Sequence, residues 1–205
     1  ISSSVYFVAK SPDEERRQHH HDKIISQIHR VTRLVDMLLL MAKLDGRFDF
    51  NLQNIRLNDL IRQVTLSLQP ISEDKQIALQ EHLPEESIML DAAPEYLKDA
   101  LYYVLENALR YTPASGEVSI SAEIVDDNTI KIMVQDNGEG IAAEHLPHIF
   151  DPFWRLDDAH NEPGFGLGLP IAEKVIDLHH GDIQVSSTPG TGTIVTIILH
   201  VRVLC

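Results

Sequence analysis

Cysteine is almost absent from this chain of 205 residues, because Cys205 at its very end is the only one. An internal disulfide is therefore excluded, and the composition fits a reducing compartment. No apolar run approaches the roughly 20 residues of a membrane span, and the N-terminus shows no signal-peptide pattern. We expect a cytoplasmic protein. Because the chain begins at Ile1 rather than at Met, we interpret it as a fragment, whose missing upstream part can carry a membrane anchor.

Positive charge is also scarce, with 17 Lys and Arg residues against 31 Asp and Glu residues and a formal net charge of −14. This balance argues against a general nucleic-acid binder, which needs a basic face. A polyanionic ligand would need local help from a metal ion, a few arginines or oriented backbone amides. The hydrophobic fraction of 43% is that of an ordinary globular protein, and the length allows one buried domain with an appendage.

Residues 1–46 form the predicted appendage. A helix start is indicated at residues 11–15, and Gly46 is expected to end the helix. Residues 1–10 are interpreted as the tail of a preceding helix. An apolar heptad seam follows at Ile24, Ile28, Val31, Val35, Leu38 and Ala42. One helix cannot bury such a seam, so we expect a homodimer in which residues 1–46 build a four-helix bundle.

Residues 47–205 have the mixed pattern of a two-layer α/β sandwich, in which helices cover one face of a mostly antiparallel sheet. Helices are predicted over residues 57–68, 94–111 and 167–178. Strands are predicted over residues 77–80, 88–90, 118–124, 130–134, 183–186 and 193–201, with a hairpin around residues 126–128.

The helix over residues 94–111 brings Tyr103, Asn107, Arg110 and Tyr111 to one face, because Asn107 follows Tyr103 by four residues, and Arg110 and Tyr111 follow Asn107 by three and four. The amide oxygen of Asn107 is a suitable Mg²⁺ ligand, since this ion takes its other oxygens from water and phosphate. Arg110 can reach a phosphate, and Tyr111 can lie against a purine. The alternative is an amphipathic helix with exposed polar residues.

The sequence Asp-Asn-Gly-Glu-Gly at residues 136–140 follows a strand. A carboxylate at this strand end can accept the exocyclic amino proton of adenine, and Gly138 and Gly140 allow the backbone to approach the base closely. A plain hairpin turn is the alternative. Against it, residues 141–144 and the aromatic run at residues 150–153 follow in place of a second strand.

Residues 164–169, Gly-Phe-Gly-Leu-Gly-Leu, precede a helix, so successive amides and the helix N-terminus can form an anion-binding concavity. They lack the Gly-Lys-Ser/Thr of a P-loop. Residues 155–163 are interpreted as a lid over a triphosphate. Arg155 at its base is either a contact of the terminal phosphate or an ordinary surface arginine. Four such elements in this order predict an ATP pocket.

Residues 14–200 resemble the second dimerisation helix and the ATP-binding (Bergerat-fold) domain of bacterial sensor histidine kinases, in the superfamily of gyrase B, Hsp90 and MutL. Residues 105–111 are similar to the N box, 136–140 to the G1 box, 149–155 to the F box, 164–169 to the G2 box and 190–193 to the last glycine motif. The implied catalytic residues are Asn107, which is also the metal ligand, Arg110 and Arg155. The implied ATP-binding residues are Asn107, Arg110, Tyr111, Asp136, Gly138, Gly140, Ile141, Phe153, Gly164, Gly166, Leu167, Gly168, Leu169 and Thr193.

The resemblance implies transfer of the γ-phosphoryl group of Mg-ATP to a histidine of the dimerisation domain, and then to an aspartate in the receiver domain of a response regulator. Two alternatives stay open: a gyrase- or Hsp90-like ATPase clamp, and a nucleotide-binding module without catalysis. Tyr103 departs from the family, because the N box usually has a polar residue there, often Asn, and gyrase-like relatives have a water-activating Glu. Tyr103 is a poor general base at neutral pH, and Glu106 lies about 100° from the Asn107 side of the helix.

The phosphoacceptor motif of the family, a His followed by an acid and ending in Thr-Pro, is missing from the chain. The segment that begins at His29 is the nearest match to this motif, but it lacks the acid and the proline. We therefore expect the acceptor to lie upstream, and we expect this chain to bind ATP without labelling itself. His145 and His148 are candidates for the mouth of the pocket.

Overall fold

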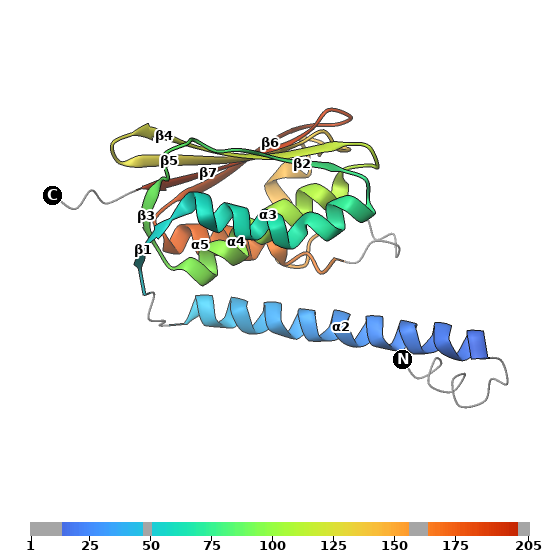
Figure 1. The fold of residues 1–205 in the computed structure, drawn as a ribbon. Helices are drawn as coiled ribbons and strands as arrows, with labels where there is room; N and C mark the ends of the chain where they lie inside the picture. Colours follow the sequence, from blue (N-terminus) through green and yellow to red (C-terminus); the bar gives the residue numbers. More distant parts are fainter. Residues whose placement is uncertain (1–13, 47–50, 156–163, 201–205) are drawn as a thin grey trace. The chain divides into compact units, whose positions relative to one another are not determined.

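The computed structural model describes residues 14–46, 51–155 and 164–200 (Figure 1). Contacts divide the chain into two units, one ending at Gly46 and one from residue 47 onward that leaves out residues 159–163. Each unit is described by itself. The expected earlier helix at residues 1–10 and most of the expected lid at 155–163 lie outside the described residues.

The first unit contains helix α2, Glu14–Asp45, which matches the predicted heptad helix. Lys43 lies in its last turn, where a cation complements the helix dipole. The amide of Gly46 donates to the carbonyl of Lys43 at 3.1 Å and closes the helix. Apolar side chains with exposed fractions of 40–56% lie along the helix, at Ile25, Ile28, Val31, Val35, Leu38 and Leu39.

The second unit contains a five-stranded sheet with the strand order β2-β4-β5-β7-β6. Its strands are β2 (Ala78–His82), β4 (Glu117–Asp126), β5 (Thr129–Asp136), β6 (Asp182–Thr188) and β7 (Gly192–His200). Only the edge pair β2 and β4 is parallel, and the other three pairs are antiparallel. The predicted hairpin is present, because β4 and β5 pair from Val118↔Asp136 to Asp126↔Thr129.

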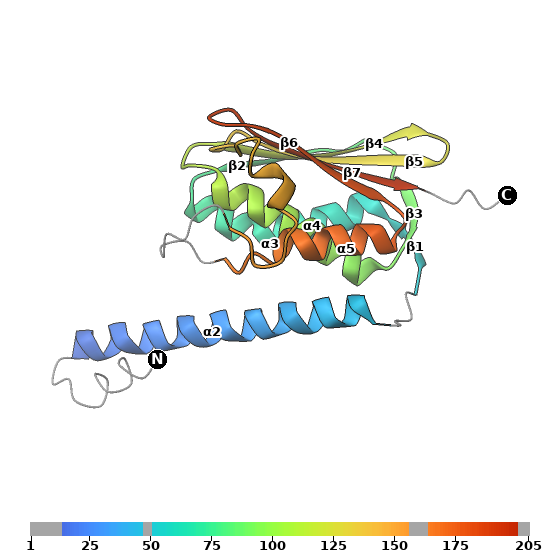
Figure 2. The same cartoon turned by 180° about the vertical axis from the view of Figure 1, so that it is seen from behind.

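Three helices cover one face of this sheet, as both views show (Figures 1 and 2). They are α3 (Leu57–Asp74), α4 (Pro94–Tyr111) and α5 (Gly168–Leu178). Alternate residues of β4 and β5 are buried beneath them, at Val118, Ile120, Ala122, Ile130, Ile132 and Val134. The period of two in burial is what a sheet with one solvated face requires. The predicted two-layer α/β sandwich is therefore confirmed.

Helix α3 is longer than predicted, because it continues from residue 68 through Pro70 to Asp74. Proline removes the amide that would bond the carbonyl of Leu66. Leu66 is 70% exposed, so this turn of α3 faces solvent. The amide of Ile77 then donates to the carbonyl of Ser72 at 2.8 Å, just after the helix ends.

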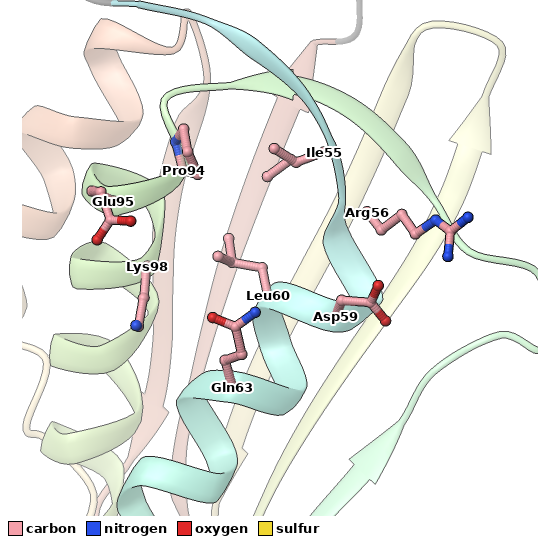
Figure 3. Close-up of a pocket in the computed structure, with 8 residues that line it drawn as sticks. All are labelled: Ile55, Arg56, Asp59, Leu60, Gln63, Pro94, Glu95 and Lys98. Carbon is pink, nitrogen blue, oxygen red and sulfur yellow. The ribbon is translucent and has the colours of Figure 1, made fainter.

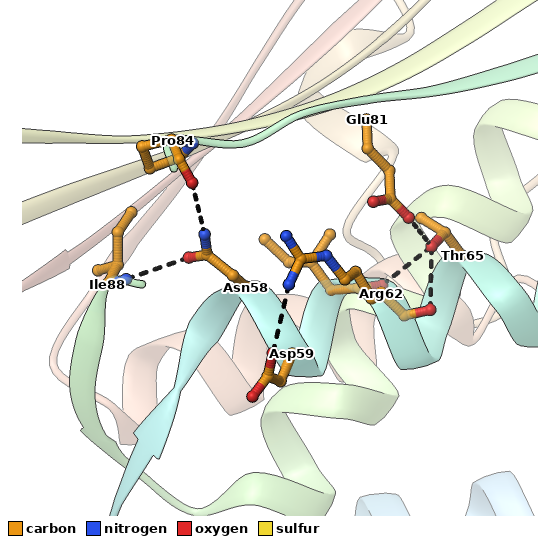
Figure 4. A network of polar contacts seen from close by, with 8 residues as sticks. Asn58, Asp59, Arg62, Thr65, Glu81, Pro84 and Ile88 are labelled. Carbon is orange, nitrogen blue, oxygen red and sulfur yellow. Dashed lines mark hydrogen bonds and ion pairs between the residues drawn. The ribbon is translucent and has the colours of Figure 1, made fainter. Parts of the chain in front are cut away.

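A second, two-stranded sheet was not predicted in full. Strand β1 (Gln53–Arg56) pairs antiparallel with β3 (Met89–Ala92), and four residues of mostly polar sequence gave β1 no recognisable pattern. The buried side chain of Asn58 fixes this region, since its Nδ2 donates to the carbonyl of Pro84 at 2.9 Å and its Oδ1 accepts from the amide of Ile88 at 3.1 Å (Figure 4). Figure 4 also shows Thr65 of α3 bonded to Glu81 of β2.

His179 joins the end of α5 to the start of α4. Its buried ring accepts a hydrogen bond at Nε2 from the amide of Ala93 (3.0 Å), so Nδ1 carries the proton and donates to the carbonyl of Val175 (2.7 Å). Burial lowers the pKa of His179 from its ordinary value of 6.5; the carbonyl of Val175 opposes this shift and His180 adds to it. The neutral ring is thus part of the fold.

We expect His179→Leu to lower the free energy of unfolding by about 1–3 kcal/mol, because the buried amide of Ala93 loses its acceptor. The lowered pKa means that the unfolded chain binds a proton that the folded chain does not. The stabilisation is therefore present above pH 6.5 and is lost as the pH falls below it. In urea titrations between pH 5 and 8, the free energy of unfolding should fall less steeply with decreasing pH in the variant than in the wild type. The control His82→Gln, at an exposed position, should keep the wild-type profile; equal profiles for His179→Leu and wild type would contradict the assignment.

Candidate functional site

The site is built around the C-terminal half of α4. The apolar face of this helix is buried at Leu97, Leu101, Val104, Leu105 and Leu109. This burial turns Tyr103, Asn107 and Arg110 to another side of the helix, where all three are half-buried, as their spacing predicted. Tyr111 at the last position is 40% exposed. The predicted N-box residues therefore share one side of α4.

The last carbonyls of α4 are held by two other segments. Lys75, just after α3, donates through Nζ to the carbonyls of Leu109 (3.0 Å) and Arg110 (2.7 Å). The amide of Glu139 donates to the carbonyl of Tyr111 at 3.2 Å. The ammonium group compensates the negative end of the helix dipole. Lys75 was missed from sequence, because a single lysine after a helix carries no signal of what it reaches.

Asp136, the last residue of β5, is 9% exposed and sits opposite Thr193 of β7. Its Oδ1 accepts from the amides of Gly138 (2.8 Å) and Thr193 (3.2 Å). Burial raises the pKa of Asp136 from its ordinary value of 3.8, and the two amide bonds oppose this rise. Among the described residues, both bonds of the carboxylate go to Oδ1, so Oδ2 is available to a ligand.

The two glycines after Asp136 permit close backbone contacts. A Cβ at Gly138 would lie 2.3 Å from the carbonyl oxygen of Tyr111, and one at Gly140 would lie 2.1 Å from that of Thr188. Gly140 also has φ of +69°, in the region that favours glycine. The described residues 137–155 that follow contain no strand, which agrees with the prediction that residues 136–140 are not a hairpin turn.

Ser187 on β6 connects this loop to the end of β7, and sequence reasoning did not find it. Its Oγ accepts from the amide of Ile141 at 2.7 Å and donates to the carbonyl of Gly192 at 2.9 Å. It also lies 2.9 Å from Oγ1 of Thr193. Two adjacent serines in a polar edge strand look alike in the sequence, and only the register of β6 on β7 distinguishes Ser187.

The aromatic run contacts the glycine-rich segment. The amide of Phe153 donates to the carbonyl of Gly166 at 2.8 Å, and a Cβ at Gly166 would lie 2.5 Å from the carbonyl oxygen of Trp154. The side chain of Phe153 is 61% exposed. The ring centroids of His145 and His148 lie 5.7 and 6.1 Å, respectively, from that of Trp154.

Among the described residues, the first amides of α5 have no hydrogen-bond acceptor. Leu167 is the N-cap without a side-chain cap bond, and the first turn carries no acid. In an α-helix the first amides have no partner within the helix, which here applies to Gly168 and Leu169, whereas Pro170 has no amide proton. The ring of Tyr103 lies against this start, since a Cβ at Gly168 would be 3.4–3.7 Å from three of its carbons.

Arg110 reaches the beginning of the glycine-rich segment. A Cβ at Gly164 would lie only 2.1 Å from its Nη1. Nη2 lies 3.7 Å from Oε2 of Glu106, one turn earlier on α4. Glu106, considered from sequence as a weak candidate base, is thus an ion-pair partner. Arg155 is half-buried, and the remainder of the expected lid, residues 156–163, lies outside the described residues.

A pocket of about 320 Å³ lies away from these residues, between β1 and the first turns of α3 and α4 (Figure 3). Its lining residues are Ile55, Arg56, Asp59, Leu60, Gln63, Pro94, Glu95 and Lys98. Within the described part of the chain, no group of three or more His, Cys, Asp or Glu side chains could hold a metal ion. No helix in that part is long and apolar enough to cross a bilayer.

The family of histidine kinase-, DNA gyrase B- and HSP90-like ATPases matches residues 92–203, more than half of the chain, including α4, Asp136 and the start of α5. The chain belongs to this family. The sensor histidine kinase YkoH of Bacillus subtilis (strain 168) is 34% identical over 178 residues, which are 86% of this chain and 38% of YkoH. The chain therefore spans well under half of this relative, and it corresponds to the catalytic region of a sensor histidine kinase.

Solved structures agree with the fold. ShkA in complex with AMPPNP has a TM-score of 0.80 at 23% identity, covering 97% of this chain and 42% of ShkA. Histidine kinase ThkA in complex with the response regulator protein TrrA has a TM-score of 0.77 at 21% identity, covering 98% of this chain and 56% of ThkA. At these identities the likeness establishes the fold alone.

Proposed function

We propose that this chain binds Mg-ATP and transfers its γ-phosphoryl group to a histidine of the dimerisation domain. The observation that carries the proposal is the meeting of three elements: the C-terminal half of α4, the carboxylate of Asp136 at the end of β5, and the uncapped start of α5. One site would thereby offer an adenine acceptor, a metal ligand and phosphate donors.

Asp136 is the proposed adenine-binding residue. Its Oδ1 is held by two amides, so the carboxylate is fixed before any ligand arrives. Oδ2 then accepts the exocyclic amino proton of adenine, which guanine cannot offer at that position. Gly138, Gly140 and Ile141 support this proposal, because the first two bring the backbone close and the third is anchored by Ser187. Tyr111 and Phe153, both exposed, are the proposed aromatic contacts of the nucleotide.

Mg²⁺ fits the donor set at Asn107. One neutral amide oxygen is a sparse protein ligand set, and Mg²⁺ suits it because this ion keeps several waters and shares phosphate oxygens. When bound, the ion would neutralise phosphate charge during transfer. The proposed phosphate contacts are the amides of residues 164–169, together with the side chains of Arg110 and Arg155.

The proposed mechanism depends on position and charge compensation, as phosphoryl transfer generally does. Asp136 fixes the base and the start of α5 fixes the phosphates, so that the terminal group faces an incoming imidazole in line. The N-box position that carries the water-activating residue in gyrase-like ATPases is occupied here by Tyr103, whose ring lies against Gly168. Glu106 is paired with Arg110. Neither group is placed to activate water, which favours transfer over hydrolysis.

The proposed division is a dimerisation segment at residues 1–46 and a catalytic domain at residues 47–205. The exposed apolar side chains of α2 support a homodimer through residues 1–46, since a stripe of this size needs a covering partner. The proposed second partner is the receiver domain of a response regulator. The likeness to ThkA, solved with the response regulator TrrA, supports that proposal.

We expect Asp136→Asn to bind ATP at least about tenfold more weakly, because an amide donor replaces Oδ2 opposite the adenine amino group. The fold should be retained, since the Asn oxygen can still accept from Gly138 and Thr193. Calorimetric titration with ATP and GTP measures the effect. Asp126→Asn at the exposed hairpin turn is the matched control and should bind as wild type. An unchanged preference for ATP over GTP in Asp136→Asn would refute this role.

Phosphoryl transfer is tested with γ-labelled ATP and Mg²⁺, by comparing this chain with a longer one in which an acceptor helix precedes residue 1. We expect acid-labile, base-stable label on the longer chain only, and none when it carries Asn107→Ala. Free phosphate released by both chains, with no label on protein, would contradict the proposal and favour an ATPase clamp.

We expect the chain to sediment as a dimer, and Val31→Glu to raise the dimer dissociation constant at least about tenfold, because it buries a charge in the apolar seam. Ser26→Glu adds the same charge to another side of α2 and should leave the dimer intact. A wild-type chain that stays monomeric at all concentrations in analytical ultracentrifugation would rule the dimer out.

A further inference from the structure

An ion pair on α4 is shielded from solvent beside the proposed phosphate site. Oε2 of Glu106 lies 3.7 Å from Nη2 of Arg110, and the two side chains are only 12% and 18% exposed. Exposed ion pairs of this spacing contribute little, because water screens them and both side chains lose freedom. A shielded pair is screened less, so the attraction between its two charges is stronger than in an exposed pair.

The guanidinium of Arg110 is also bounded on a second side. A Cβ at Gly164 would lie 2.1 Å from Nη1 and 3.2 Å from Cζ, so the guanidinium fills the space that any other residue would occupy. The backbone of Arg110 is held independently, since its carbonyl accepts from Lys75 at 2.7 Å. The backbone of Arg110 is therefore held by Lys75, and Glu106 is the charged partner of its head group.

A carboxylate at position 106 needs a physical reason. It precedes the proposed metal ligand Asn107, in a chain whose formal net charge is already −14. By charge alone, Glu106 would repel a polyphosphate and weaken its binding. An arginine side chain, however, has many rotamers, and its planar head binds phosphate well only when it is oriented. Restraining that head is what the carboxylate can contribute.

We propose that Glu106 is a positioning residue: it holds the guanidinium of Arg110 against Gly164, where it contacts the terminal phosphate, and so sets the preference for ATP over ADP. The inference rests on the proposed function. The position of Gly164 supports a contact of Arg110 with phosphate rather than with the base. Gly164 begins the segment that leads to the first amides of α5, the proposed phosphate contacts, whereas Asp136 is the proposed base-binding residue. If Glu106 positions Arg110, removal of its carboxylate lowers the preference for ATP over ADP. If Glu106 only repels phosphate, removal leaves this preference unchanged or raises it.

The test is calorimetric measurement of the dissociation constants of ATP and ADP, each with Mg²⁺, for wild type, E106Q, R110Q and the double variant. We expect wild type to prefer ATP and R110Q to lose this preference. E106Q should lower the ratio of the ADP constant to the ATP constant by about threefold or more, with the ADP constant changed less than about twofold. The double variant should match R110Q, because Glu106 acts through Arg110.

Glu95→Gln is the matched control, since it removes the same charge from an exposed position on α4, roughly 16 Å away along the helix. It should leave the ratio unchanged. An unchanged or increased ATP preference in E106Q would overturn the proposal in favour of repulsion. Equal weakening of ATP and ADP would overturn it in favour of a purely structural role. Failure of the wild-type chain to bind either nucleotide would instead show that the proposed function itself is wrong.

Discussion

Burial of one face of α4 against the sheet and its neighbouring helices is the interaction on which the candidate site depends. Leu97, Leu101, Leu105 and Leu109 are fully buried, at intervals of four residues along the helix. Because the period of a helix is 3.6 residues, fixing this face also fixes the direction of Asn107 and Arg110. A rotation of α4 would remove large apolar side chains from the core, so the chemistry on its other side is held by packing energy.

Backbone contacts then join α4 to the rest of the site. The carbonyl of Tyr111 accepts from Glu139 in the loop after β5, and Asp136 at the end of β5 accepts from the amide of Thr193 on β7. These contacts involve main-chain groups on at least one side. The same loop requires glycine at positions 138 and 140, because a Cβ at either would overlap a carbonyl oxygen. The arrangement is therefore rigid where a base would bind. Rigid donors and acceptors cost no reorganisation when a ligand arrives.

Electrostatics distinguish this site from a basic phosphate-binding surface. The chain is strongly acidic, so in the proposed site a triphosphate would be accommodated by local charge: the amides that begin α5, the head group of Arg110 and a metal ion at Asn107. Lys75 and Glu106 act behind these groups. The first compensates the negative end of α4, and the second occupies the other side of the guanidinium. The charges of Lys75 and Glu106 are thus directed at groups of the protein, α4 and Arg110, and not at the ligand.

The sequence alone determined the secondary elements with a strong period and the motifs with a distinctive order. The helix over residues 94–111, the β4–β5 hairpin and the loop at 136–140 were predictable, because burial periods and glycine positions are local properties. Strand β1 and the partners Lys75 and Ser187 were decided only by tertiary structure. Strand β1 pairs with β3, Lys75 reaches the carbonyl of Leu109, and Ser187 accepts from the amide of Ile141, each of them distant in the chain. The pairing of Glu106 with Arg110 is local in spacing, yet its shielding beside Gly164 depends on a segment more than fifty residues away.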